Sequence, residues 1–313
     1  MAGGRWQRRA REWLGYRALA VLVRAGVFLR GPGADAVGRA LGFAAEVLSP
    51  HYRHLVLANM RQAFGRDKGE AEIQALMRSF YRHLGQAVIE FARGPHLSDQ
   101  QVQRLVSLQG TEHLDSALSA GRGAIVISAH MGCWELAVRH SALAGYRMNA
   151  IARSQADVAF AGALDVSRSA ARLGIIPKAG AVAAAVQCLS RNESVIFVVD
   201  ENAGEKGVFA PFFGKLASTH VGPIVAASRS GAPVIPAFAF RWPDARQGVE
   251  VLPALPLRLY GDLAEDMVYN ATLINRAIED AIRRHPEQWL WINKRWRTRP
   301  PGEKAGLPEP GPR

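Results

Sequence analysis

The sequence predicts an α/β fold in which helices flank a central sheet, preceded by a helical and basic N-terminal section. Short apolar runs bounded by Gly, Asp or Asn recur along the chain, as is typical of buried strands. Stretches with helical periodicity separate these runs after residue 95, and only helical patterns precede it. Strands that alternate with helices form a sheet covered on both faces, so the α/β part is expected after residue 95.

The elements of this α/β part are predicted in a regular order. Strands are expected at 124–128, 194–199, 233–240 and 249–252. Helices are expected at 132–144, 156–173, 180–191, 220–230 and 267–284. The chain is therefore divided into a helical N-terminal section at 1–95, one α/β domain at 96–300 and a disordered tail at 301–313.

The N-terminal section combines helical patterns with basic and aromatic residues. Apolar residues recur at helical spacing over 34–48 and 70–93. Upstream, an Arg- and Trp-rich start leads into an apolar run at 18–29, which is too short to span a bilayer and contains Arg24. We expect this segment to lie in a membrane interface, the alternative being a basic-ended helix packed on the protein body.

Composition and charge narrow the classes of function. The chain has 313 residues, of which 49% are hydrophobic and 21% charged, as in globular proteins. Residues 1–60 and 283–313 together carry 11 of the 12 excess positive charges, so the body between them is nearly neutral. Candidate partners of the basic ends are anionic lipid head groups, an acidic carrier protein or a nucleic-acid backbone. Only two cysteines are present, which excludes a disulfide scaffold and a four-cysteine zinc site.

The most informative motif is His130 with Glu135, which follows the strand predicted at 124–128. If both residues lay in one continuous helix, their separation of five positions would place the two side chains about 140° apart around the helix axis, so they would not share a face. If His130 instead lies on the turn before the helix, its ring can fold back toward Glu135, and the helix N-terminus would keep it neutral. A carboxylate on one ring nitrogen leaves the other to take a proton, as in a general base. The alternative is a strand-end histidine satisfied by its own backbone.

A second candidate region follows the strand predicted at 194–199. Asp200 lies at the carboxyl end of that strand, where ligands of open α/β sheets bind. Lys206 lies in the next turn, and Phe212 and Phe213 could form the apolar wall of a site. The alternative for these phenylalanines is ordinary core packing.

The third region, at 284–300, interleaves three tryptophans with basic residues that include Arg297. This pattern suits phosphorylated glycolipid head groups at a membrane or single-stranded nucleic acid. The alternative is a C-terminal element packed by its tryptophans, with its charges solvated.

Other chemistries lack their signatures. The sequence contains no phosphate-binding glycine loop, no nucleophile elbow and no metal-binding cluster, so no metal and no cofactor are expected. Cys133 lies within the motif of His130, but we expect it to be a buried and inert thiol rather than a nucleophile.

Taken together, these residues resemble the bacterial late lipid A acyltransferases, the lauroyl/myristoyl type within the lysophospholipid-acyltransferase superfamily. The resemblance covers roughly residues 17–300 and rests on an ordered series of motifs. These are Asn59–Phe64 (NMRQAF), His130–Glu135 (HMGCWE), Arg153, Asp200, Gly207–Gly214 (GVFAPFFG), Gly231–Val234 (GAPV) and Pro286–Trp291 (PEQWLW).

The resemblance implies a mixed central sheet and transfer of a fatty acyl chain from an acyl carrier protein thioester to a hydroxyl of a lipid A precursor. His130 would deprotonate this hydroxyl and Glu135 would fix the ring tautomer, with no acyl-enzyme. Arg153 and Asp200 would lie near the site, and a further family arginine falls near Arg168 or Arg172. The enzyme would work at the cytoplasmic face of the inner membrane. Cys133 in place of a common Asn, and Asn202 and Asn293 at two other family positions, leave the acceptor and the chain length open.

Two alternatives remain besides this hypothesis. The same chemistry could act on another membrane glycolipid, such as a mannosylated phosphatidylinositol. The chain could also be an inactive membrane-associated scaffold, although it retains His130 and Glu135. Nucleic-acid binding is the weakest interpretation because no recognition module accompanies the basic ends, so no nucleic-acid partner is expected.

Overall fold

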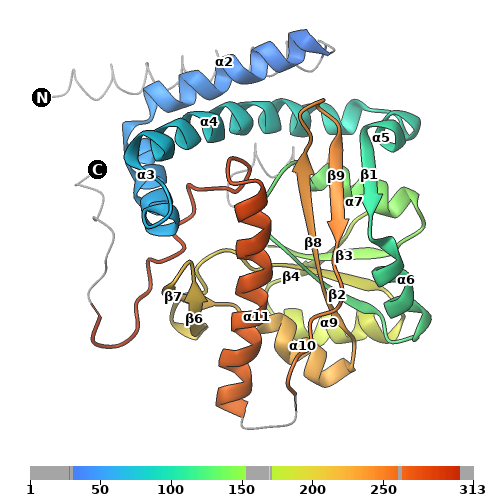
Figure 1. Cartoon of the computed structure of the whole chain (residues 1–313). Helices are drawn as coiled ribbons and strands as arrows, with labels where there is room; N and C mark the ends of the chain where they lie inside the picture. Colours follow the sequence, from blue (N-terminus) through green and yellow to red (C-terminus); the bar gives the residue numbers. More distant parts are fainter. Residues whose placement is uncertain (1–27, 29–30, 153–168, 170, 260–262, 304–313) are drawn as a thin grey trace, which may run out of the picture.

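The computed structural model describes residues 28, 31–152, 169, 171–259 and 263–303. Its described part is organised around a seven-stranded sheet with the order β1-β9-β8-β2-β5-β3-β4 (Figure 1). The strands are β1 (Val106–Gln109), β2 (Ala124–Ser128), β3 (Met148–Ala152), β4 (Gly174–Pro177), β5 (Ser194–Val198), β8 (Val234–Arg241) and β9 (Gln247–Val251).

The sheet is mixed. β2 runs parallel to both of its neighbours, β5 and β8, and β3 runs parallel to β5 and β4. β9 is antiparallel to β8 and parallel to β1, so the direction reverses at one side of the sheet. The predicted fold class, α/β with a mixed central sheet flanked by helices, is therefore confirmed.

Helices cover both faces of the sheet. Alternating residues of the buried strand β2 enter different apolar cores, as expected for a strand buried on both sides. Val126 packs with α5 (Asp99–Leu105), α6 (Thr111–Ser119) and α7 (Trp134–Leu143). Ile125 and Ile127 pack with α9 (Ala181–Ser190), α10 (Gly222–Ser230) and α11 (Leu263–Arg284), and α11 crosses the front of the molecule in Figure 1.

In the described residues, the chain begins with the helices α2 (Pro32–Leu48), α3 (Pro50–Phe64) and α4 (Glu70–Arg93), which come before α5 and the sheet. α2 lies along α4 at one end of the molecule (Figure 1). The two backbones meet through glycines, since a Cβ atom on Gly85 would lie 2.0 Å from the carbonyl oxygen of Gly38. A Cβ atom on Gly42 would lie equally close to the carbonyl oxygen of Tyr81, so this helix contact depends on the missing side chains.

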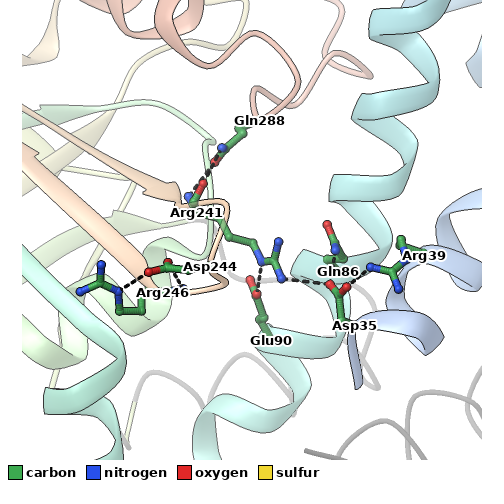
Figure 2. A network of polar contacts seen from close by, with 8 residues as sticks. All are labelled: Asp35, Arg39, Gln86, Glu90, Arg241, Asp244, Arg246 and Gln288. Atoms are coloured by element: carbon green, nitrogen blue, oxygen red, sulfur yellow. Dashed lines mark hydrogen bonds and ion pairs between the residues drawn. The ribbon is translucent and has the colours of Figure 1, made fainter. Parts of the chain in front are cut away.

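A polar network, here called the Arg241 network, joins these helices to the sheet (Figure 2). Arg241 at the end of β8 donates to Glu90 of α4 over 2.7 Å and to Asp35 of α2 over 3.0 Å. Gln86 also donates to Asp35. The side chain of Gln288 accepts from the backbone N–H of Arg241 and donates to its carbonyl oxygen, over 2.7 and 2.8 Å. One arginine thus fastens two helices and the C-terminal segment to one strand.

The C-terminal segment packs against a small antiparallel hairpin of β6 (Val208–Phe212) and β7 (Lys215–Thr219). Trp289, Trp291 and Trp296 are each at most 1% exposed and belong to the core. The prediction that these tryptophans face lipid head groups or nucleic acid is therefore wrong, and the alternative of a tryptophan-packed element is correct. Their rings find apolar partners in the hairpin and in α3, including Phe212 and Phe64.

The structure adds elements that periodicity did not indicate, namely α3, α5, β1, α6, β3, β4 and the hairpin. The turn Gly94–His96 and the turn Gly204–Lys206 are 3-10 helices, labelled η1 and η2. Most of the helix predicted at 156–173, the apolar run at 18–29 except for Phe28, and the tail from 304 onward lie outside the described residues.

Candidate active site

His130 and Asp200 meet because they follow two neighbouring parallel strands. Ser128 at the end of β2 is paired with Val198 at the end of β5, and His130 and Asp200 each lie two residues beyond these ends. The backbone N–H of Val199 donates to the carbonyl oxygen of Ser128, which extends the pairing by one step. The carboxyl ends of parallel strands share one edge of the sheet, so both side chains are positioned by the sheet itself.

Asp200 is completely buried and receives hydrogen bonds from three nitrogens. Its Oδ1 lies 2.8 Å from Nδ1 of His130. Its Oδ2 accepts from the backbone N–H of His130 over 2.9 Å and from the indole Nε1 of Trp289 over 2.7 Å. A carboxylate on Nδ1 makes that nitrogen the donor in the neutral imidazole, which leaves the lone pair on Nε2.

The carboxylate that binds the imidazole of His130 is thus that of Asp200 and not that of Glu135, which the sequence predicted in this role. The residues from Ala129 to Cys133 form a loop, and α7 begins only at Trp134, so Glu135 lies on its first turn. Gly132 makes this loop possible, since it has a φ of +56° and a Cβ atom there would lie 2.8 Å from the carbonyl oxygen of Ala239. Glu135 lines the same cavity as His130, and its charge contributes to raising the pKa of the imidazole.

The environment of His130 favours the protonated ring. Burial lowers its pKa, but the charge of Asp200 and the hydrogen bond to it outweigh burial and raise the pKa to about 9. The charges of Glu201 and Glu135 act in the same direction. Burial raises the pKa of Asp200, but the charge of His130 and the hydrogen bonds lower it further, so the net direction is downward. The expectation that the helix N-terminus keeps His130 neutral is therefore wrong, because these carboxylates dominate.

A cavity of about 500 Å³ opens beside His130. Its polar lining comprises Glu135, Lys178, Glu201 and His220 in addition to His130. Its apolar lining includes Ile151, Ile175, Val182, Phe197 and Leu290. The burial of His220 lowers its pKa, which favours the neutral ring. The cavity therefore offers an apolar wall to a hydrocarbon chain and polar groups to a head group near the imidazole.

The other predicted site residues lie elsewhere. Phe212 and Phe213 are in the core, because their rings pack against each other and against neighbouring aromatic rings, so they do not form the wall of the cavity. Lys206 and Arg297 are exposed and are not among the residues that line the cavity. Arg172 is also exposed and pairs with Asp99 of α5 over 3.7 Å. Arg153 and Arg168 lie outside the described residues.

Cys133 has the properties expected of an inert thiol. Its side chain is 2% exposed, and burial raises the pKa of the thiol well above its usual value. Among the described residues, no group of three or more His, Cys, Asp or Glu side chains is arranged to hold a metal ion.

Sequence reasoning missed two residues that organise the site. Trp289 binds Asp200, and Asn59 of α3 donates from its fully buried amide to the carbonyl oxygens of Trp291 and Asn293 over 2.7 and 2.8 Å. Both residues lie within motifs that carried the family resemblance, but nothing in those motifs indicates that they meet. The buried Arg295 fixes the same region by donating to Ser218, Thr219 and Asn275.

A carboxylate-bound imidazole at the carboxyl edge of an α/β sheet, beside an apolar cavity, is suited to acid–base group transfer onto a lipid-like molecule. The comparisons make the class definite. Residues 4–298 match the family described as bacterial lipid A biosynthesis acyltransferases. The chain belongs to this family and is an acyltransferase.

Individual relatives agree with the family. The lipid A biosynthesis palmitoleoyltransferase of Escherichia coli K12 is 28% identical over 94% of this chain and 94% of its own. The lauroyltransferase of the same organism is 24% identical over 93% of this chain and 92% of its own. A phosphatidylinositol mannoside acyltransferase of Mycobacterium tuberculosis H37Rv is 28% identical over 63% of this chain and 61% of its own.

Among solved structures, the 1-acyl-sn-glycerophosphate acyltransferase of Thermotoga maritima matches 82% of this chain and 98% of its own. The sequence identity is 11% and the TM-score is 0.38.

Proposed function

We propose that this enzyme moves a fatty acyl chain from an acyl carrier protein thioester to a hydroxyl of a lipid A precursor, with His130 as general base. The observation that carries the proposal is the imidazole of His130, bound at Nδ1 by Asp200 and placed at the mouth of an apolar cavity. Membership of the family supports the acceptor, and the two E. coli relatives are named for transfers in lipid A biosynthesis.

The chemistry follows from the orientation of the ring. Nε2 of neutral His130 takes the proton of the acceptor hydroxyl as its oxygen attacks the thioester carbonyl carbon. The carbon–sulfur bond then breaks, and the imidazolium returns the proton to the leaving thiolate. Asp200 stabilises the imidazolium between these two steps, and Glu135 adds negative charge from the cavity wall. The acyl chain passes directly from sulfur to oxygen, and no acyl-enzyme is formed.

The absence of an acyl-enzyme is consistent with the state of Cys133. A buried thiol with a raised pKa is a poor nucleophile, and its place before α7 does not give it access to solvent. Cys133→Ala should therefore retain acyl transfer. This variant also serves as a matched control, because it changes the loop that carries His130 without touching the base.

The experiment is to express the wild-type chain, His130→Ala and Cys133→Ala in a Gram-negative host that lacks its own late acyltransferases. Mass spectrometry of extracted lipid A gives the position and length of any added acyl chain. We expect the added chain with the wild type and Cys133→Ala and a loss of at least about 10²-fold with His130→Ala. Transfer by His130→Ala at the wild-type rate would disprove the mechanism.

A second acceptor is supported by the mycobacterial relative, whose name specifies phosphatidylinositol mannoside. The residues around His130 are compatible with either glycolipid, since the described cavity wall is largely apolar. Purified wild-type enzyme should be assayed in parallel with a lipid A precursor and a phosphatidylinositol mannoside, using one acyl carrier protein thioester. Transfer to the mannoside alone would replace lipid A as the proposed acceptor, and coenzyme A thioesters test the donor in the same assay.

We also propose that residues 1–95 form a membrane-facing section that places the enzyme at the cytoplasmic face of the inner membrane. In the part of the chain that the structure describes, no helix has the length and apolar character to span a bilayer. The junction of α2 and α3 nevertheless exposes Phe43, Val47 and Leu48, and the side chain of Leu48 is 78% exposed. The basic residue Arg53 lies nearby in the sequence and is exposed, as suits an anionic lipid surface.

This surface can be tested with full-length protein and vesicles. The triple variant Phe43→Ser, Val47→Ser and Leu48→Ser should sediment less with vesicles that contain anionic phospholipid. Val268→Ser, an exposed apolar residue of α11, is the control and should bind like the wild type. Unchanged binding of the triple variant would disprove a role for this junction.

A further inference from the structure

Trp289 is tied to the loop that carries His130 by its backbone as well as by its side chain. Trp289 and Met131 form an isolated antiparallel bridge. The backbone N–H of the next residue, Leu290, donates to the carbonyl oxygen of His130 over 3.0 Å. The indole is 0% exposed, so its position is fixed by the surrounding core. The indole N–H is therefore presented to Asp200 by a segment that is already fastened to the base.

The carboxylate needs this donor because water does not reach it. Asp200 is 0% exposed, and a buried carboxylate is stable only where hydrogen bonds replace its hydration. Two of its three hydrogen bonds, from Trp289 and from the backbone of His130, converge on Oδ2. Oδ1 faces the imidazole, which is its hydrogen-bond partner among the described residues. The donors on Oδ2 thus set the orientation of the carboxylate that orients the imidazole.

We propose that Trp289 is a positioning residue of the acyl transfer, which acts through Asp200 to set the orientation and the proton affinity of His130. The catalytic part of this statement rests on the proposed function. The indole does not touch the reacting atoms. It completes a chain of contacts from a buried N–H, through a carboxylate, to the base.

Trp291 provides an internal comparison for this role. It is as buried as Trp289, and the centroids of the two rings lie 4.6 Å apart. Its indole N–H donates over 2.6 Å to the backbone carbonyl of Pro286 and not to the carboxylate. Removal of either indole N–H removes one buried hydrogen bond from the same core, but only one of the two changes acts on Asp200.

The direction of the effect follows from charge. Without the indole N–H, the charge of the Asp200 carboxylate is less stabilised. This loss of stabilisation is larger when His130 is neutral than when the imidazolium faces the carboxylate, so the protonated ring becomes more favourable. The pKa of His130 should therefore rise. The other charged or titratable groups that line the cavity are the same in each variant. They are Glu135 of α7, Lys178 after β4, Glu201 after β5 and His220 before α10. The charge of Arg295 in the C-terminal segment, which interacts with that of Asp200, is also unchanged.

The experiment compares wild type, Trp289→Phe and Trp291→Phe in the full chain. The first readout is a pH titration of the isotope-labelled His130 ring by NMR, which does not depend on activity. We expect Trp289→Phe to raise the pKa of His130 by roughly one unit and Trp291→Phe to leave it unchanged. The second readout is acyl transfer, where kcat of Trp289→Phe should fall about tenfold at neutral pH with little change in KM, and the deficit should narrow as pH rises.

Each result decides the proposal. The proposal is overturned if the pKa of His130 is the same in Trp289→Phe and Trp291→Phe. It is also overturned if this pKa is lower in Trp289→Phe than in the wild type. If the phenylalanine variant does not fold, incorporation of benzothienylalanine at position 289 keeps the ring shape and removes only the N–H, and the same shift is required. A shift of the pKa in a chain that transfers no acyl group would retain the positioning role and overturn the proposed function instead.

Discussion

Two buried polar clusters of this molecule hold carboxylates in opposite ways. Asp200 receives three hydrogen bonds and faces an imidazole, and its pKa is lowered although it is fully buried. Glu90 in the Arg241 network has an arginine partner at 2.7 Å, yet burial raises its pKa beyond what Arg241 offsets (Figure 2). Burial alone therefore does not decide the charge of a carboxylate. The balance between burial and the charges and hydrogen bonds of the partners decides it.

The difference separates the cluster that we propose for proton transfer from one that attaches segments to each other. The first joins two strand ends and the C-terminal segment around the titratable imidazole of His130, which lines a cavity. The second joins α2, α4 and β8 around Arg241, whose guanidinium does not titrate near neutral pH. Changes in the first cluster should alter the rate and its pH dependence, and changes in the second should alter stability.

The largest expected effect is that of Asp200→Asn. The variant should lose about 10²- to 10⁴-fold in kcat, because the amide no longer stabilises the imidazolium or fixes the ring tautomer. The pKa of His130 should fall from about 9, since the attraction that outweighs burial is gone. The acid limb of the pH–rate profile should thus move to lower pH, opposite to the shift expected for Trp289→Phe. An acid limb that stays in place would show that Asp200 does not control the base.

A medium effect is expected for Arg241→Met, which removes the centre of the second cluster. Glu90 and Asp35 would lose their contacts with this guanidinium, although Asp35 keeps those with Gln86 and Arg39, and the free energy of unfolding should fall by about 2 kcal/mol. The loss of stability should grow as pH rises. At low pH Glu90 is buried as a neutral acid, whereas at high pH it must be buried as a charge without the compensation of Arg241. Denaturant unfolding at two pH values measures it.

The matched control is Arg246→Met, since Arg246 pairs with Asp244 at an exposed position in the same view (Figure 2). This variant should leave the unfolding free energy nearly unchanged, because water and salt screen an exposed ion pair. If the two arginine variants lose the same stability, the attachment role of Arg241 is wrong.

The smallest effect is expected for Gln288→Leu, which cuts the link between the clusters. Gln288 bonds the backbone of Arg241, and the next residue is Trp289. We expect a loss of about 1 kcal/mol in stability and an unchanged pKa of His130, because the indole is held by its own backbone bridge. A shifted pKa in this variant would show that the two clusters act as one unit.

The sequence was sufficient for the parts that depend on local pattern. Apolar runs at 124–128 and 194–199 predicted the buried strands β2 and β5 because each is followed by a polar residue and a turn. The same reasoning placed His130 and Asp200 after strands, at the edge where ligands bind. Strands β3 and β4 were not predicted, because the apolar run of β3 (MNAIA) is interrupted by Asn149 and β4 (GIIP) has only four residues.

The parts that failed depend on contacts between distant segments. Asp200 pairs with His130 only because β5 lies beside β2, although β3 and β4 come between them in the sequence. Glu135 is close to His130 in the sequence, and the motif of the two residues predicts that they pair, but the motif carries no information on the neighbouring strand that brings Asp200. The tryptophans near the C-terminus have a composition typical of a membrane surface, but the hairpin and α3 enclose them. Local composition does not distinguish these two environments.

The bridge between Met131 and Trp289 also bears on the order in which the enzyme matures during synthesis. Every strand of the described sheet and α11 precede residue 289 in the chain, so a growing polypeptide can assemble this framework while the indole donor has yet to be translated. Until then Asp200 lacks one of its hydrogen bonds and the loop of His130 lacks its bridge. We expect catalytic competence to arise only after Trp289 has been translated, later than the helices α2, α3 and α4.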